Sequence, residues 1–226
     1  MTPASPIPRP PAELLDASGH VKGSGRFAPA LELEAWIWTE ILSEDRPLSN
    51  YGHGHLSEHS ARIGLVWSTE RYHKSGRRIL GTAQRGEPTG SAWSAGRQRQ
   101  QLREWFGNVP DFLILLDAWH ADHAIRTEQP QNFLAVLEHE LYHCAQDRTA
   151  DGDPRFTQDG EPVWGIRPHD TEEFAGVIQR YGVGASPNAS PLASAIEYVR
   201  EHGPDVAQST LDGLCGTCKR SLQLAA

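Results

Sequence analysis

Residues 139–143 read His-Glu-Leu-Tyr-His and lie in a segment whose apolar residues recur at helical spacing. A helix has about 3.6 residues per turn, so two histidines four positions apart share one face. Two such imidazoles can hold a zinc ion. Glu140 points to the same side, where its carboxylate can take a proton from a metal-activated water without binding the metal. The pentapeptide therefore predicts a zinc-dependent hydrolase, with His139 and His143 as metal ligands and Glu140 as the base.

The sequence around the pentapeptide predicts a helix from Asn132 to Asp147. Its apolar residues form a stripe that would pack on a core: Leu134, Leu137, Leu141 and Ala145. Asn132 is a candidate N-cap, and the polar stretch from Gln146 through Pro154 ends the helix. Tyr142 faces elsewhere on the helix and is assigned to packing, while Cys144 is expected to be a small buried residue of the helix.

A catalytic zinc ion usually takes three protein ligands and leaves a fourth position for water, so a third donor must come from elsewhere. Residues 167–174, Arg-Pro-His-Asp-Thr-Glu-Glu-Phe, open a second predicted helix. Its His169 is favoured as the third ligand, with Glu173 as the alternative. Asp170 can accept a hydrogen bond from a ligating imidazole and so fix its tautomer. In a competing interpretation Asp170 is the N-cap, Glu173 completes a capping box and Glu172 is solvated.

Two motifs follow one another along the chain, and an apolar run precedes them: 109–117 (VPDFLILLD), 137–144 (LEHELYHC) and 168–174 (PHDTEEF). In this order they resemble the putative phage metallopeptidases, small zincin-like proteins in which H-E-L-x-H precedes a helix introduced by H-D-x-E-E-F. The similarity spans Leu31 to Gly182. It implies a metallopeptidase carried by a phage or prophage, with the metal at His139, His143 and the turn from His169 to Glu173, and Glu140 as base. It implies no particular substrate.

The predicted fold class is α+β, a zincin-like minimal metallopeptidase fold. Apolar spacing predicts a first helix over Leu31 to Leu42. Three strand candidates follow: Ala61 to Ser68, Arg77 to Ala83 and Phe112 to Trp119. Gly86 to Gly96 is a predicted loop before a helix over Arg97 to Phe106. We therefore expect a small three-stranded or larger sheet packed on an N-terminal helix and two metal-bearing helices.

Zincin-like folds, which this element order resembles, place an edge strand of the sheet beside the metal. Such a strand can pair with an extended peptide through main-chain hydrogen bonds. Phe112 to Trp119, the most apolar of the three strand candidates, is our candidate for this edge strand.

Composition divides the chain into three parts. Residues 1–30 are rich in Pro, Gly, Ala and Ser and predict a flexible arm outside the core. Residues 31–184 form the predicted zincin-like metallopeptidase domain, and residues 185–226 a tail with a short helix and a C-x-x-C. Cys215 and Cys218 are half of what a structural zinc ribbon needs, so a redox motif, a shared zinc site and an incidental pair all stay open.

Charge and hydropathy restrict the partners. A formal net charge of -8 without a concentrated Lys/Arg block argues against a nucleic-acid partner. The chain lacks an apolar run of about eighteen residues and a charged-then-apolar N-terminus, which predicts no membrane partner and a cytoplasmic location, in the bacterial host if phage encoded. We expect Zn²⁺ as cofactor and a peptide or protein as substrate. The alternative is a non-catalytic, zinc-stabilised binding or scaffold protein of a phage or host assembly.

Other histidines carry weaker signals. A cluster precedes the first strand candidate: His53, His55 and His59. Residues 55–59 match the inverted pattern H-x-x-E-H, but Leu56 is the only apolar residue nearby, so we expect a polar loop or surface turn. His120 and His123 follow a strand candidate, where they can stabilise a developing oxyanion or lie at an exposed strand end.

Overall fold

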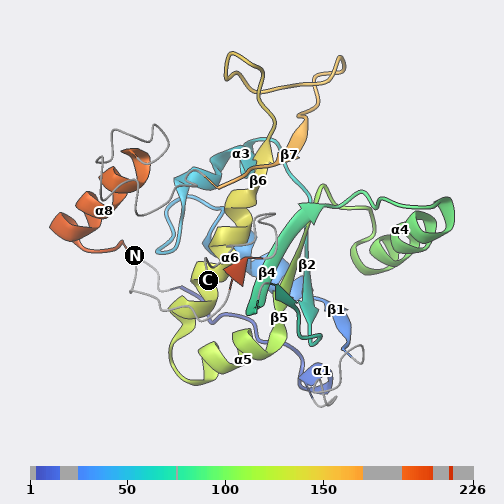
Figure 1. Cartoon of the computed structure of the whole chain (residues 1–226), viewed down its shortest axis with the longest axis horizontal. Coiled ribbons are helices and arrows are strands. Elements are labelled where there is room, and N and C mark those ends of the chain that lie inside the picture. Colours follow the sequence, from blue (N-terminus) through green and yellow to red (C-terminus); the bar gives the residue numbers. More distant parts are fainter. Residues whose placement is uncertain (1–3, 16–24, 75, 170–189, 206–213, 216–226) are drawn as a thin grey trace. The chain divides into compact units, whose positions relative to one another are not determined.

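The computed structural model describes residues 4–15, 25–74, 76–169, 190–205 and 214–215. The chain divides into two compact units, residues 1–167 together with 209–226, and residues 168–208. The first unit contains the sheet and the pentapeptide helix (Figure 1). In the second unit, helix α8 spans Ser190–His202 and exposes most of its side chains. The predicted domain boundary between residues 184 and 185 lies outside the described residues.

The fold is mixed α+β, with a sheet whose described strands run in the order β1-β2-β5-β4-β3, and with β8 also paired to β4. These strands are β1 (Phe27–Pro29), β2 (Ile63–Ser68), β3 (His73–Lys74), β4 (Arg77–Arg85), β5 (Phe112–Asp117) and β8 (Leu214–Cys215). β2 is parallel to β5 and β8 is parallel to β4, whereas the other pairs are antiparallel. The three predicted strands are therefore present, and β4 extends to Arg85.

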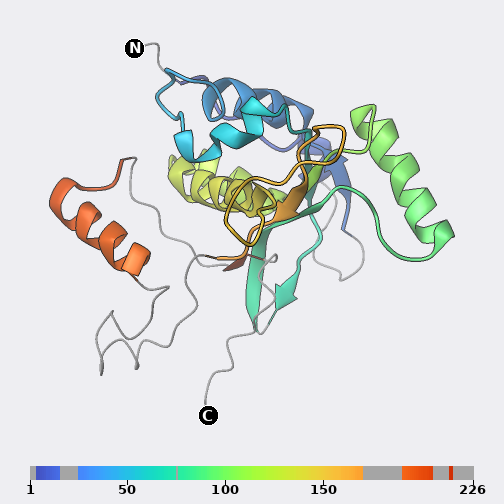
Figure 2. The ribbon, with the colours of Figure 1, turned by 90° about the horizontal axis from the view of Figure 1, so that it is seen from above.

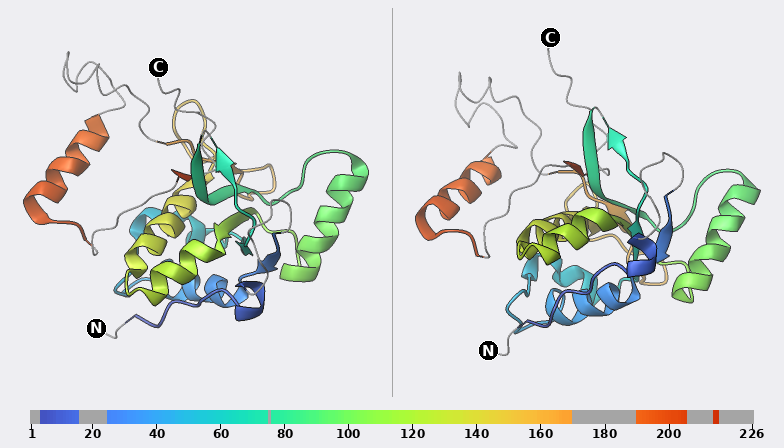
Figure 3. Two further views of the ribbon diagram at one scale, coloured as in Figure 1. Left: turned by 60° about the horizontal axis from the view of Figure 1, so that its bottom comes forward. Right: turned by 90° about the horizontal axis from the view of Figure 1, so that it is seen from below.

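Helices cover both faces of the sheet. On one face lie α2 (Leu31–Glu40), α5 (Ala118–Arg126) and α6 (Pro130–His143), and on the other lies α4 (Ala92–Phe106), as Figure 2 shows for α6 and α4. Figure 3 shows α5 and α6 side by side. Shorter elements complete the unit: α1 (Ala12–Leu15), η1 (Tyr51–His53), α3 (Gly54–Glu58), β6 (Cys144–Gln146) and β7 (Trp164–Ile166).

The strand sequences explain the two layers of helices. Successive strand residues point to opposite faces, so Leu65 and Ile114 enter the larger apolar cluster while Val66 and Leu113 enter the smaller one with Leu102 of α4. Strands that are buried on both faces are apolar almost throughout. The continuous apolar character of β2 and β5 is thus the signature of strands in the middle of the sheet.

The edge-strand prediction for Phe112 to Trp119 is wrong. β5 ends at Asp117 and lies between β2 and β4, so the backbone groups on both its sides already take part in the sheet. The strand that contacts α6 most extensively is β4. On the outer side of β4, Ile79 and Gly81 pair with Leu214 and Cys215 of β8.

Parts of the N-terminal stretch belong to the core. Leu14 and Ala30 are buried in the larger apolar cluster, and β1 pairs with β2. The indole Nε1 of Trp36 donates a hydrogen bond to the carbonyl oxygen of Ser5 at 3.0 Å. The expectation that residues 1–30 lie outside the core is therefore wrong for Leu14 and Ala30.

Helix α4 begins earlier than its sequence pattern predicted. Ser91 is the N-cap, and its hydroxyl oxygen accepts a hydrogen bond from the backbone N–H of Ser94 at 3.3 Å. The predicted loop over Gly86 to Gly96 is therefore helical from Ala92 onward. None of the helices in the described part of the chain has the length and apolar character that a bilayer span requires.

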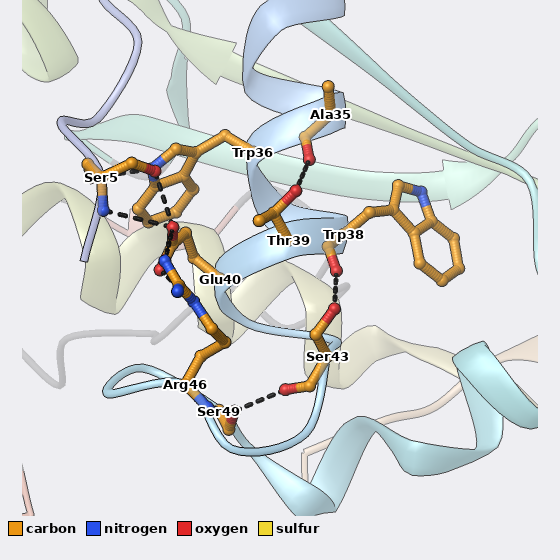
Figure 4. Close-up of polar contacts among 9 residues, drawn as sticks. All are labelled: Ser5, Ala35, Trp36, Trp38, Thr39, Glu40, Ser43, Arg46 and Ser49. Atoms are coloured by element: carbon orange, nitrogen blue, oxygen red, sulfur yellow. Dashed lines mark hydrogen bonds and ion pairs between the residues drawn. The ribbon is translucent and has the colours of Figure 1, made fainter. Parts of the chain in front are cut away.

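Glu40, at the end of α2, is a buried carboxylate with 0% exposure. Arg46 donates to it from Nε at 3.1 Å and also contacts it through Nη2, and the Ser5 hydroxyl donates at 2.7 Å (Figure 4). Hydrogen bonding to Arg46, assisted by Ser5, favours the charged form and outweighs burial, so the pKa of Glu40 is lowered to about 2.

We expect Arg46→Met to lower the free energy of unfolding at pH 7 by about 3 kcal/mol, because a buried charge loses its main partner. Since the folded-state pKa of Glu40 lies below its ordinary value of 4.5, its contribution is present above pH 4.5 and is lost toward pH 2. Urea unfolding should therefore show the difference between variant and wild type shrinking in that window.

The matched control is Arg62→Met, which removes an ion pair with Asp111 in which the arginine side chain is 59% exposed. This change is expected to cost less than about 1 kcal/mol. If Arg46→Met and Arg62→Met lowered the free energy of unfolding equally, the burial of Glu40 would not account for the effect of Arg46.

Candidate metal centre

Helix α6 carries three of the predicted site residues. Pro130 occupies the first turn, where its fixed φ and missing N–H are tolerated, and Gln129 is the N-cap. Asn132, the predicted cap, instead lies inside the helix. The helix ends at His143, earlier than predicted, because Cys144 begins strand β6. Cys144 is buried as expected, although in a strand.

His139 and His143 lie one helical turn apart on α6. Their ring centroids are 5.0 Å apart and the ring planes form an angle of 76°. His139 is half-buried and His143 is 3% exposed. The helix thus brings the two imidazoles together as the spacing predicted.

Arg167 fixes the tautomer of His143. The Nδ1 atom of His143 lies 2.6 Å from the carbonyl oxygen of Arg167. A carbonyl oxygen only accepts, so Nδ1 carries the hydrogen and Nε2 keeps the lone pair that a metal ion needs. The backbone N–H of Arg167 also donates to the carbonyl oxygen of His143 at 2.9 Å. The chain at Arg167 is therefore held beside the end of α6 by two hydrogen bonds.

A hairpin that the sequence analysis did not anticipate delivers Arg167 to this position. β6 and β7 are antiparallel, with Cys144 opposite Ile166 and Gln146 opposite Trp164. Two Asp-Gly turns lie between them, in which Gly152 and Gly160 have φ of 90° and 81°. Asp-Gly next to strand-forming residues is a hairpin signal, so these dipeptides were the sequence feature that could have revealed it.

His169 joins the two histidines of α6. The potential ligand atoms of His139, His143 and His169 all lie within 4.8 Å of one another, and this group could hold a metal ion. Three imidazole donors that leave a coordination position open are a ligand set of catalytic zinc, so the residues present fit this metal. The alternative ligand Glu173 and its neighbours Asp170 and Glu172 lie outside the described residues.

Glu140 lies against strand β4 and is 0% exposed. A Cβ atom built on Gly81 would lie 2.8 Å from Cγ and 3.0 Å from Oε1 of Glu140. Strand and helix therefore approach each other closely where the candidate base lies. Gly81 was not among the residues predicted from the sequence to lie at the site, although a glycine inside a strand often marks such an approach.

The first histidine cluster is not the polar loop or surface turn that its sequence suggested. His53 ends η1 at 1% exposure, and Leu56 of α3 is fully buried. Burial, helped by the charge of His55, lowers the pKa of His53 to about 4, so its ring is neutral at pH 7. Its ring centroid lies 4.4 Å from that of Tyr142, which packs there as expected.

Neither His55 nor the later histidine pair takes part in the three-histidine group. His55 Nε2 donates to the carbonyl oxygen of Cys144 at 2.9 Å. His120 and His123 lie in α5, not at an exposed strand end. Within the described ranges, the three-histidine group is the only set of three or more potential metal-ligand side chains. The predicted tail cysteine Cys218 lies outside those ranges.

Comparison with protein families gives one matching family. A family model described as "Putative phage metallopeptidase" matches residues 34–197. The match includes every candidate site residue and extends past Gly182, where the similarity was expected to end. No curated protein and no solved structure matches the chain.

Proposed function

The chain belongs to the putative phage metallopeptidase family, and from this premise we propose that it is a zinc-dependent peptidase that cleaves peptide bonds with an activated water. The observation that carries the proposal is the three-histidine group, with the buried Glu140 in the same helix. Membership of this family supports the assignment of a hydrolase that acts on a peptide or protein. Zinc and the roles of individual residues are our proposal.

In this proposal His139, His143 and His169 are the metal ligands, and His169 is preferred to Glu173. The hydrogen bond to the Arg167 carbonyl oxygen supports the assignment of His143, because it leaves Nε2 for the metal. Asp170 remains the proposed hydrogen-bond acceptor for a ligating imidazole.

When bound, the zinc ion lowers the pKa of a water molecule in its open position and polarises the substrate carbonyl. Glu140 accepts the proton of the attacking water and later transfers it to the leaving amine. A buried position suits this task, because a fixed carboxylate shielded from solvent needs little reorganisation during proton transfer.

We also propose that the fold is zincin-like, with β4 in place of β5 as the strand next to the metal-bearing helix. The close approach of Gly81 to Glu140 supports this arrangement. It agrees with the predicted order of a helix, strands and then the pentapeptide helix.

The proposal is tested by incubating the zinc-loaded protein with a peptide library prepared from a bacterial proteome and mapping new termini by mass spectrometry. We expect cleavage at a recurring sequence context, lost with a zinc chelator and restored by added Zn²⁺. Protein that holds zinc but yields no new termini would overturn the proposed activity and favour a zinc-stabilised scaffold.

A further inference from the structure

We propose that Gly81 is a positioning residue for Glu140, because the missing side chain at position 81 gives the carboxylate the space it occupies. The inference rests on the proposed function, since it takes Glu140 as the base. It adds a residue from a different element of the fold to the site.

The contacts at Gly81 leave no room for a methyl group. The nearest atoms to a built Cβ belong to Glu140 and Val136, at 2.8 to 3.0 Å. Non-bonded carbon atoms favour a separation of about 3.5–4.0 Å, so a Cβ at this position forces its neighbours to move. None of these nearest atoms belongs to a histidine.

The backbone at Gly81 cannot easily withdraw from the helix. It pairs with Leu116 of β5 on one side and with Cys215 of β8 on the other. The helix is equally fixed, because Leu137 and Leu141 of α6 are fully buried. An added methyl group is therefore accommodated mainly by displacing the Glu140 side chain.

Backbone conformation does not explain this glycine. Gly81 is not among the described glycines with positive φ, so other residues can adopt its conformation. A glycine inside a strand destabilises it through backbone entropy and lost packing. In this proposal the glycine is kept despite its cost in stability, because it leaves space for the Glu140 carboxylate.

The test uses the Co²⁺-loaded protein and acetohydroxamic acid, which chelates the metal and gives a proton to a neighbouring carboxylate. Binding is followed through the visible absorption of Co²⁺ at constant pH. We expect Glu140→Gln to weaken acetohydroxamate binding by roughly tenfold or more, because a hydrogen bond to a charged group is lost. Gly81→Ala should weaken it to a similar extent while Co²⁺ affinity stays within about threefold of wild type.

The matched control is Gly64→Ala on β2. A Cβ there would lie 3.1 Å from Phe106 and Pro110, so it introduces similar crowding in the same sheet without touching Glu140. Acetohydroxamate affinity should stay at the wild-type value. Should Gly81→Ala not fold, the double variant Gly81→Ala/Val136→Ala removes the Val136 contact and keeps the one to Glu140.

The outcomes separate the inference from the proposed function. If Glu140→Gln weakens acetohydroxamate binding and the folded position-81 variant does not, the inference is overturned and the proposed function stands. If wild type binds no Co²⁺, or Glu140→Gln binds acetohydroxamate like wild type, the proposed function fails and the inference with it.

Discussion

Glu140→Gln is expected to lower the rate of peptide hydrolysis roughly a thousand-fold while the metal stays bound. The amide has nearly the same shape as the carboxylate, so it fits the buried space against Gly81. It cannot accept a proton from the attacking water. The rate is measured on a peptide identified from the library, and the zinc content of each preparation by elemental analysis.

Glu138→Gln is the matched control, because Glu138 lies on the same helix and is only partly buried. Burial raises the pKa of Glu138. Its Oε2 accepts a hydrogen bond from the side-chain amide of Asn50 at 2.7 Å, so this carboxylate already has a structural partner. Its amide variant should keep the rate within about threefold. Full activity in Glu140→Gln, or an equal loss in both variants, would show that Glu140 is not the base.

His143→Ala is expected to weaken zinc binding more than about a hundredfold and to remove the stabilisation that zinc gives to the folded chain. The side chain supplies a proposed ligand atom and also the hydrogen bond to Arg167. Zinc at about a thousand times its Kd stabilises a protein by about 4 kcal/mol, so wild type and variant should differ clearly in their thermal response to zinc. Chelator competition and thermal unfolding with and without Zn²⁺ measure the two effects.

His55→Ala distinguishes loss of a ligand from loss of any histidine near α6. His55 is part of the inverted H-x-x-E-H pattern and donates to the Cys144 carbonyl oxygen, but it is outside the three-histidine group. Its variant is expected to keep one zinc ion per chain. Zinc retained by His143→Ala at wild-type affinity would remove His143 from the ligand set.

Local periodicity accounts for the elements that were predicted correctly. The i, i+4 spacing of His139 and His143 and the apolar stripe beside them depend only on helix geometry, and α6 places both imidazoles as expected. The strands β2, β4 and β5 were likewise predicted as short strand candidates separated by loop residues. Family membership was recognisable from the same motifs, since these residues follow one another in the sequence.

The wrong predictions concern contacts between distant parts of the chain. β5 was taken for an edge strand, yet its neighbours β2 and β4 come from other parts of the sequence. His53 was predicted to lie in a polar loop or surface turn, because the Tyr142 ring that packs against it lies far away in the sequence. Burial of the N-terminal Leu14 likewise depends on residues that pack on it from elsewhere in the fold.

The sequence by itself determined the helix that carries two imidazoles one turn apart, because the spacing of residues along a helix is a local property. Only the tertiary structure shows that the Arg167 carbonyl oxygen orients His143, that the predicted His169 lies beside the two histidines of α6 and that Gly81 leaves space for Glu140. Each of these depends on two segments that meet in space. Contacts between such segments result from the packing of the whole core, which no short stretch of sequence encodes.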